Sequence, residues 1–425
     1  MNLFIISSCV FFASIVFVSK NKTLLMFLIK SLLPLMAILF IAALIIYPKT
    51  SVSSASKGIK LWFEIVFPSL FPFFVASQLL SKSGIVSLFG VILEPIMRPL
   101  FNVPGCGSFA LAMGVVSGYP VGATITAELR KQETISRIEA ERLLTFTNNS
   151  GPLFIMGAVA VGMFNQPKLG YLLYTCHIAA CLTVGFIFRY YRRGQTKLNV
   201  KVKQNMTQNL KIELKRLRNS DMNPWSLFGD CIKNSVYTIL AIGGFIIFFS
   251  VMINIMINCG LIAGLSNIIS VFSSAVGLGY DAVQGILCGF FEITTGANLI
   301  SQSPASLTVK LCCVSLIIGW AGFSVHTQVM SIVSSTDIRV KPYLIGKALQ
   351  GVISCFYTFI GYSFFSSFLL KESPAFANNP EGSLNQWGNV FKASIQLIGL
   401  WALIMVVALL ACICIIKVKS KKSLL

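Results

Sequence analysis

Acidic residues and histidines are scarce in this chain. Its 425 residues include 14 Asp and Glu and 2 His against 34 Lys and Arg, and only 11% of all residues are charged. Soluble proteins carry about a quarter charged residues, and no polar stretch here is long enough to enclose a core. Apolar runs of about 20 residues recur along the whole length. The composition therefore excludes a soluble protein and predicts an all-α, polytopic membrane protein.

Sequence motifs of catalysis and metal binding are also missing. The chain contains no GxxxxGK[ST] phosphate loop, no HExxH pair and no GxSxG elbow, and no nucleophile stands beside a base. Most of its 12 cysteines lie in apolar runs without zinc-ligand spacing. We therefore expect no enzyme activity, no metal and no cofactor.

The net charge of +20 does not indicate a nucleic-acid partner. Lys and Arg gather at the ends of apolar segments and between Arg189 and Asn223, without interleaved aromatic residues. This placement is typical of the positive-inside bias of membrane proteins. It predicts a basic cytoplasmic linker between two halves. The apolar segments of both halves are expected to lie in the lipid bilayer.

Charge placement also predicts the membrane path. We expect about nine transmembrane helices, a surface helix over Ile85–Phe101 and two re-entrant helical hairpins that enter from opposite sides, which makes the halves inverted repeats. The predicted domains are N-terminal transmembrane helices (1–60), a first repeat (61–190, hairpin near 108–130), the linker (191–224), a second repeat (225–341, hairpin near 282–303) and C-terminal transmembrane helices (342–425). The first predicted transmembrane segment on this path is Leu3–Val18, and the last is Phe391–Ile416.

The first hairpin has its predicted tip at Ser117, Gly118, Tyr119 and Gly122. Glycine permits unusual backbone angles, and the intervening Pro120 withholds a hydrogen-bond donor. A break of this kind inside hydrocarbon persists only where protein or a water-filled cavity satisfies the freed backbone groups. The alternative is an ordinary contact between helices through small residues. We favour a tip that binds substrate.

The second hairpin carries Glu292, followed by Thr294, Thr295 and Asn298. A carboxylate in an apolar span costs about 2.5–3.5 kcal/mol on insertion scales and marks a substrate or ion path. The alternative is a structural carboxylate paired with an Arg or Lys elsewhere. We include these four residues in the predicted binding site.

Each hairpin is followed by a second interrupted segment. Asn148, Asn149 and Ser150 precede a Gly-Pro pair in the first half, and Ser324 and His326 follow Gly322 in the second. Adjacent carboxamides offer donors and acceptors in several directions. A polar clasp between helices is the alternative for the asparagines, and a satisfied structural histidine is an equal alternative for His326.

Arg98 and Arg142 flank the first hairpin and are candidates for attracting an anion. The alternative is that they are charges that set the topology. Arg130, at the end of the hairpin, fits the topological alternative better.

Several of these stretches resemble one protein family. The stretches are Glu94–Gly105, Ser117–Ala123, Glu141–Leu144, Thr147–Pro152 and Phe291–Gly296. They are similar, in the same order, to the sporulation integral membrane proteins of the YlbJ type. That family carries the nucleoside-recognition Gate domain also found in concentrative nucleoside transporters. The resemblance covers roughly residues 60–370.

The resemblance implies a protein of the outer forespore membrane that moves dipicolinic acid toward the forespore. Dipicolinate is a small dianion, for which Asn148, Asn149, Ser150, Arg98 and Arg142 would be suitable partners. Transport by alternating access is the leading hypothesis, with Na+ or H+ as an open choice of coupling ion. A passive channel or gate for a nucleoside-like solute and a sporulation scaffold without transport are the alternatives. Assembly into a homo-oligomer is left open.

Overall fold

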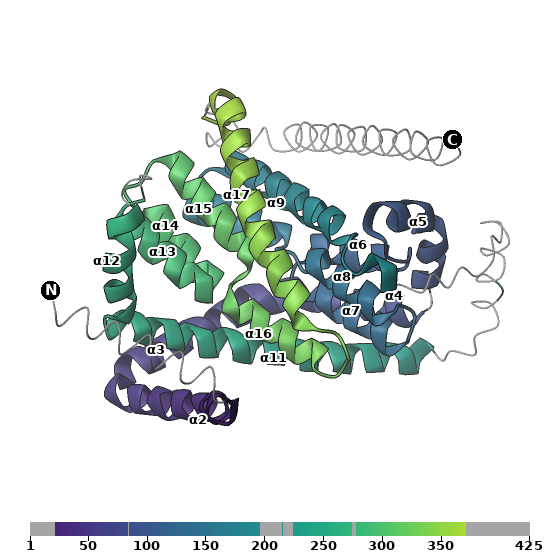
Figure 1. The fold of residues 1–425 in the computed structure, drawn as a ribbon, viewed down its shortest axis with the longest axis horizontal. Helices are drawn as coiled ribbons and strands as arrows, with labels where there is room; N and C mark the ends of the chain where they lie inside the picture. Colours follow the sequence, from purple (N-terminus) through teal and green to yellow (C-terminus); the bar gives the residue numbers. More distant parts are fainter. Residues whose placement is uncertain (1–21, 84, 196–214, 216–223, 274–277, 371–425) are drawn as a thin grey trace, which may run out of the picture. The chain divides into compact units, whose positions relative to one another are not determined.

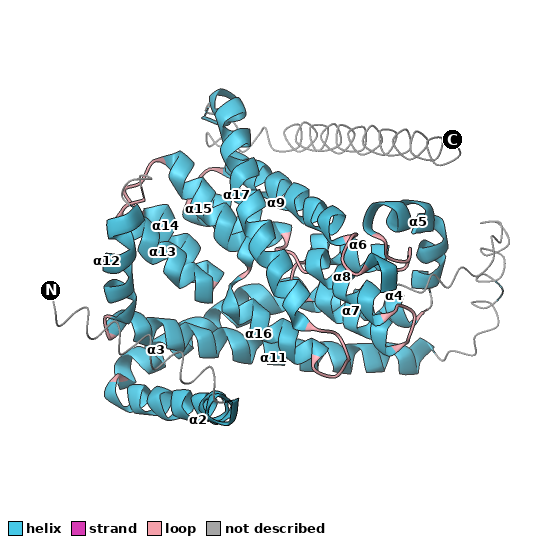
Figure 2. Ribbon diagram, viewed as in Figure 1, coloured by secondary structure: helices cyan, strands magenta, loops and turns pink. Residues whose placement is uncertain are grey.

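The protein consists of helices joined by short turns. The computed structural model describes residues 22–83, 85–195, 215, 224–273 and 278–370, and no strand occurs among them (Figure 2). The predicted all-α class is therefore confirmed. The predicted segments Leu3–Val18 and Phe391–Ile416, like most of the basic linker, lie outside the described residues.

Of the five N-terminal elements that the structure describes, the first four pack against one long helix of the second half. The five are α2 (Lys22–Ile46), α3 (Pro48–Leu61), the π-helical turn η1 (Trp62–Val66), α4 (Phe67–Lys82) and α5 (Ile85–Phe101). Helix α11 (Pro224–Asn258) lies along α3 and α4. The indole Nε1 of Trp62 donates a hydrogen bond to Ile239 O of α11 over 3.0 Å.

Both predicted hairpins are pairs of short helices that pack on each other. The first consists of α6 (Gly107–Ser117) and α7 (Val121–Lys131), and the second of α13 (Tyr280–Phe291) and α14 (Ile293–Gln302). None of these helices approaches the length of about 20 residues that crosses a bilayer. Their re-entrant character and their opposite directions of entry stay predictions.

A broken helix follows each hairpin. In the first half, α8 (Arg137–Thr147) stops at Asn148 and the π-helix η2 (Leu153–Met163) continues after Pro152. In the second half, α15 (Leu307–Trp320) and α16 (Gly322–Val333) are separated by Ala321 alone. Helix α8 starts with a capping box: Ser136 Oγ accepts from Glu139 N, and Glu139 Oε2 accepts from Ser136 N. The order of hairpin and broken helix therefore occurs twice.

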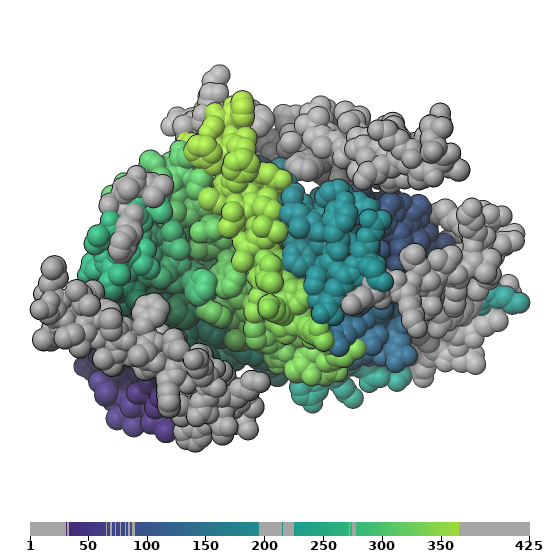
Figure 3. Space-filling model, in the orientation of Figure 1, coloured from purple at the N-terminus to yellow at the C-terminus, as the bar shows by residue number. Residues whose placement is uncertain are grey.

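Helix α17 (Val340–Leu370) connects the two halves across one face of the molecule (Figures 1 and 3). The Tyr357 hydroxyl bonds to Thr183 of α9 (Pro167–Phe188) over 3.0 Å. The Ser354 hydroxyl bonds to Ser315 of α15 over 2.7 Å. Two short elements, η3 (Arg193–Gln195) and α12 (Leu261–Ser273), complete the described chain. The described residues up to Ser366 form one compact unit.

Several described helices can cross a membrane by length and composition. They are Pro167–Phe188, Trp225–Asn258, Leu307–Val333 and Val340–Phe364. A fifth span results if the bent pair Pro34–Ile46 and Pro48–Glu64 is counted as one. Part of the predicted path lies outside the described residues, so the count of about nine stays a prediction.

The first hairpin lies so close to the end of α8 that it tolerates no side chain at two positions. A Cβ added at Gly114 or at Gly122 would overlap the carbonyl oxygen of Thr147. Glycine is therefore required on both arms of the hairpin, for packing rather than for backbone angles.

We predict that Gly122→Ala destabilises the protein by about 1–3 kcal/mol, the usual cost of overpacking. Thermal unfolding of the purified protein in detergent would show the loss. Gly244→Ala in α11 is the matched control, because a Cβ there meets no atom within 4 Å. Equal unfolding temperatures for the two variants would contradict the close approach.

Candidate functional site

The tip of the first hairpin contacts the break between α8 and η2. Gly118 has φ +86°, a left-handed angle that favours glycine. A Cβ at Gly118 would lie 2.7 Å from Gly151 N, and one at Gly151 would lie 3.0 Å from Ser117 O. Two interruptions of helical hydrogen bonding therefore meet at one point. Their freed backbone groups need partners from neighbouring side chains or from a ligand.

The second half repeats this contact. Ala321 and Gly322 have φ +79° and +76°, and a Cβ at Gly322 would lie 3.1 Å from Phe291 O at the turn of the second hairpin. The indole Nε1 of Trp320 donates to Phe290 O over 3.1 Å. The turn of each hairpin is thus held against the break of the helix that follows it.

Asn148 connects the first break to α16 and α17. Its Nδ2 donates to the Tyr343 hydroxyl over 3.0 Å, and the same hydroxyl lies 3.0 Å from His326 Nδ1. All three side chains are buried. The structure therefore brings together Asn148 and His326, two site residues predicted from separate halves of the sequence.

Asn149 and Lys347 extend this polar centre. Asn149 Oδ1 accepts from Gln350 Nε2 over 2.9 Å. Lys347 Nζ donates to Gln350 Oε1 over 2.7 Å and to Asn148 O over 2.9 Å. Lys347 is fully buried, at 0% exposure. No carboxylate of the described residues forms an ion pair with it. The centre therefore contains a buried lysine without an acidic partner in the described chain.

Ser150 completes the first break. Its backbone N–H donates to His177 Nε2 of α9 over 3.2 Å. Tyr119 of the hairpin tip lies next to Ser150 and within the electrostatic range of Glu292. Tyr119 of the first hairpin therefore lies near the turn of the second hairpin.

Several buried polar atoms at this centre have no hydrogen-bond partner of standard geometry within the described residues. Such atoms are rare in folded proteins, because each costs about 1–3 kcal/mol when left without a partner. They belong to the predicted tip, to the first break and to the two histidines. They are Ser117 Oγ, Tyr119 Oη, Asn148 Oδ1, Ser150 Oγ, His177 Nδ1 and His326 Nε2.

Glu292 caps the helix that it precedes. Its carboxylate accepts from Thr294 N and Thr295 N, each over 2.8 Å, and from the Thr295 hydroxyl over 2.9 Å. Its partners in the structure are thus the N-terminus of α14, rather than an Arg or Lys. Asn298 is exposed, and its Oδ1 accepts from Gln302. Ser324 is buried near the start of α16.

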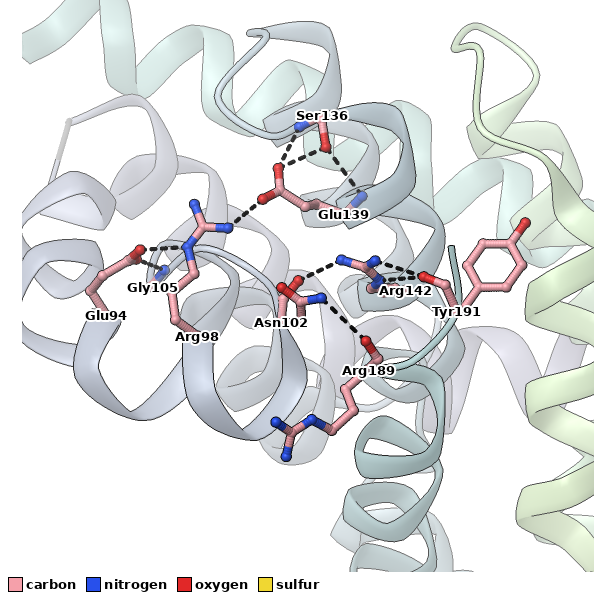
Figure 4. A network of polar contacts seen from close by, with 9 residues as sticks. All are labelled: Glu94, Arg98, Asn102, Gly105, Ser136, Glu139, Arg142, Arg189 and Tyr191. Atoms are coloured by element: carbon pink, nitrogen blue, oxygen red, sulfur yellow. Dashed lines mark hydrogen bonds and ion pairs between the residues drawn. The ribbon is translucent and has the colours of Figure 1, made fainter. Parts of the chain in front are cut away.

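Arg98 and Arg142 take part in a different network (Figure 4). Arg98 bonds to Glu94 over 2.6 Å and to Glu139 over 2.5 Å. The buried Arg142 donates to Tyr191 O over 2.6 and 2.9 Å and to Asn102 O over 2.8 Å. These contacts join α5, α8 and the end of α9. They give both guanidinium groups a structural role.

Arg130 also has a structural partner. Its guanidinium donates to both carboxylate oxygens of Asp337, over 2.8 and 3.0 Å, and ties the end of α7 to the loop before α17. This contact holds the pKa of Asp337 below its ordinary value. Because the pair is partly exposed, its contribution to stability is small.

Sequence reasoning missed four side chains of the centre, namely His177, Tyr343, Lys347 and Gln350. Lys347 carried a usable signal, because a lysine inside the apolar run of α17 is an intramembrane charge. His177 in the apolar run of α9 carried a similar signal, because histidine is rare in transmembrane helices. Tyr343 and Gln350 carried no signal of comparable strength. Only the packing of α9 and α17 against the first break brings them to the site.

The chain resembles known membrane proteins over most of its length. Residues 63–187 match the Gate family, described as nucleoside recognition. Over 331 residues the chain is 44% identical to the sporulation integral membrane protein YlbJ of Bacillus subtilis, which covers 76% of this chain and 80% of that protein. A structure of CNTnw in an outward-facing state aligns with a TM-score of 0.39 and 13% identity, over 78% of this chain and 87% of that one.

The long apolar helices and the 44% identity define an integral membrane protein with several membrane-spanning helices, part of which matches the Gate family. Within that class, the chain belongs to the family of YlbJ-type sporulation integral membrane proteins of spore-forming bacteria.

We predict that Glu292→Ala destabilises the protein by about 1–2 kcal/mol, the usual cost of losing a helix cap. Glu292→Gln should cost less, because one amide oxygen can still accept from Thr294 N or Thr295 N. Thermal unfolding in detergent measures both effects. Equal unfolding temperatures for wild type, Glu292→Gln and Glu292→Ala would contradict the capping role.

Proposed function

We propose that this protein transports a small organic anion through the polar centre between the two hairpins, by alternating access. The observation that carries the proposal is the buried Lys347 ammonium, which has no carboxylate partner among the described residues. A buried charge is costly unless it is paired. An anionic substrate supplies the missing negative charge when it is bound.

Helix ends add to this preference. Helix α7 begins at Val121, η2 at Leu153 and α16 at Gly322, each directly after a break and each without a side-chain cap. Uncapped N-termini present free N–H groups and partial positive charge, which favour anions. The one carboxylate near these turns, Glu292, is itself compensated by the N-terminus of α14. The centre therefore favours an anionic ligand over a cationic one.

The anion that fits best is dipicolinate, moved toward the forespore by a protein of the outer forespore membrane. Two arguments support it. The family is one of sporulation membrane proteins, and dipicolinate carries two carboxylates that each need donors. The Ser117 hydroxyl is a buried donor without a partner in the described chain, and the buried Tyr119 and Ser150 hydroxyls have no partner of standard geometry there besides each other. Lys347 adds a charge-assisted hydrogen bond.

We predict that purified protein in liposomes takes up dipicolinate with saturable kinetics and with countertransport. Asn149→Ala should lower uptake about tenfold or more, because the loss of one partner leaves buried polar groups unsatisfied, at about 1–3 kcal/mol. Spores of a deletion strain complemented with Asn149→Ala should contain correspondingly less dipicolinate.

The control is Asn254→Ala in α11, whose side chain bonds only within its own helix, to Ser250 O. This variant should transport like wild type. Unsaturable flux would indicate a passive channel. Normal spore dipicolinate with Asn149→Ala at wild-type protein levels would contradict transport through this centre.

A further inference from the structure

Lys347 lies at the C-terminal end of a half-helix. Its Nζ donates to Asn148 O, directly after the last residue of α8. The C-terminal end of a helix carries partial negative charge and free carbonyl oxygens. In transporters with broken helices, such ends and the unwound carbonyls beside them bind the coupling cation. The ammonium of Lys347 therefore occupies a place at which a mobile cation would bind.

The surroundings hold the ammonium at this break. A Cβ at Gly346 would lie 2.8 Å from Thr145 Cβ, so glycine allows α17 to approach the end of α8. Gln350 Nε2 donates to Asn149 Oδ1, which turns Gln350 Oε1 toward Lys347 Nζ. One oxygen partner of Lys347 Nζ, Asn148 O, thus belongs to the break itself. The other, Gln350 Oε1, is oriented by Asn149.

Two further backbone carbonyls at this helix end are already engaged. Phe146 O accepts from Asn149 Nδ2 over 2.8 Å and from Cys181 Sγ over 2.8 Å. Thr147 O is covered by the glycines of the first hairpin. A Na+ ion must replace its hydration shell with several oxygens, and the two oxygens that bind Lys347 Nζ are not available to it. The end of α8 is therefore filled by the ammonium.

We propose that Lys347 is a built-in cation that takes the place of a mobile Na+ at the α8–η2 break, so that transport needs no Na+. An ammonium has three N–H donors, and two of them bind Asn148 O and Gln350 Oε1. The third donor is available for a substrate carboxylate. This last step rests on the proposed function, whereas the occupation of the cation position does not.

The first experiment measures thermal unfolding of the full-length protein in detergent, in NaCl and in choline chloride at equal ionic strength. Wild type should unfold at the same temperature in both salts. Lys347→Ala should unfold at a lower temperature in choline, and Na+ or methylammonium should raise that temperature. Lys341→Ala, which removes an exposed lysine at the start of the same helix, should behave like wild type.

The second experiment measures dipicolinate uptake by liposomes that contain the wild-type protein, in the same two salts. Equal uptake supports the built-in cation, and uptake at least tenfold lower in choline overturns it. A Na+-dependent unfolding temperature of wild type also overturns it, without any variant having to fold. So does a Lys347→Ala protein that equals wild type in every salt. Absence of dipicolinate uptake in both salts contradicts the proposed function instead, and the unfolding comparison still decides the role of Lys347.

Discussion

The structure depends on the satisfaction of backbone groups at helix breaks that face each other inside an apolar fold. Each break frees N–H and C=O groups that cannot remain without partners in hydrocarbon. At the first break, Gly118 and Gly151 let two chain segments touch, while Lys347 and Asn149 bind the carbonyls at the end of α8. On the opposite side of the break, the Ser150 N–H donates to His177 Nε2 and the Ile155 N–H donates to Gly151 O. The proposed anion site rests on this asymmetry between carbonyl and N–H groups.

The position of α17 follows from the same requirement. It contributes Tyr343, Lys347 and Gln350 to the first break, and further along it bonds to α9 and to α15. One helix therefore supplies the charge of the centre and also connects the two halves. A movement of α17 relative to α8 would therefore change the position of the Lys347 side chain.

The sequence predicts the hairpins and the helix breaks. It does not predict which side chains of other helices pack against those breaks. Gly118 with Pro120, and Gly151 with Pro152, are local signals, and the hairpin and the break appear where these residues predict them. Glu292 was correctly placed at a turn, but its capping contacts with Thr294 and Thr295 depend on a helix start that composition does not define. Lys347 lies about 200 residues from Asn148, and only packing brings the two together.

The central claim is that the polar centre binds an organic anion, and equilibrium binding tests it most directly. Radiolabelled dipicolinate should bind the purified protein saturably, with one site per chain. The neutral dicarboxamide of the same ring, which has the same shape without the charge, should fail to compete at equal concentration. Absence of binding, or equal competition by the neutral compound, would contradict the account.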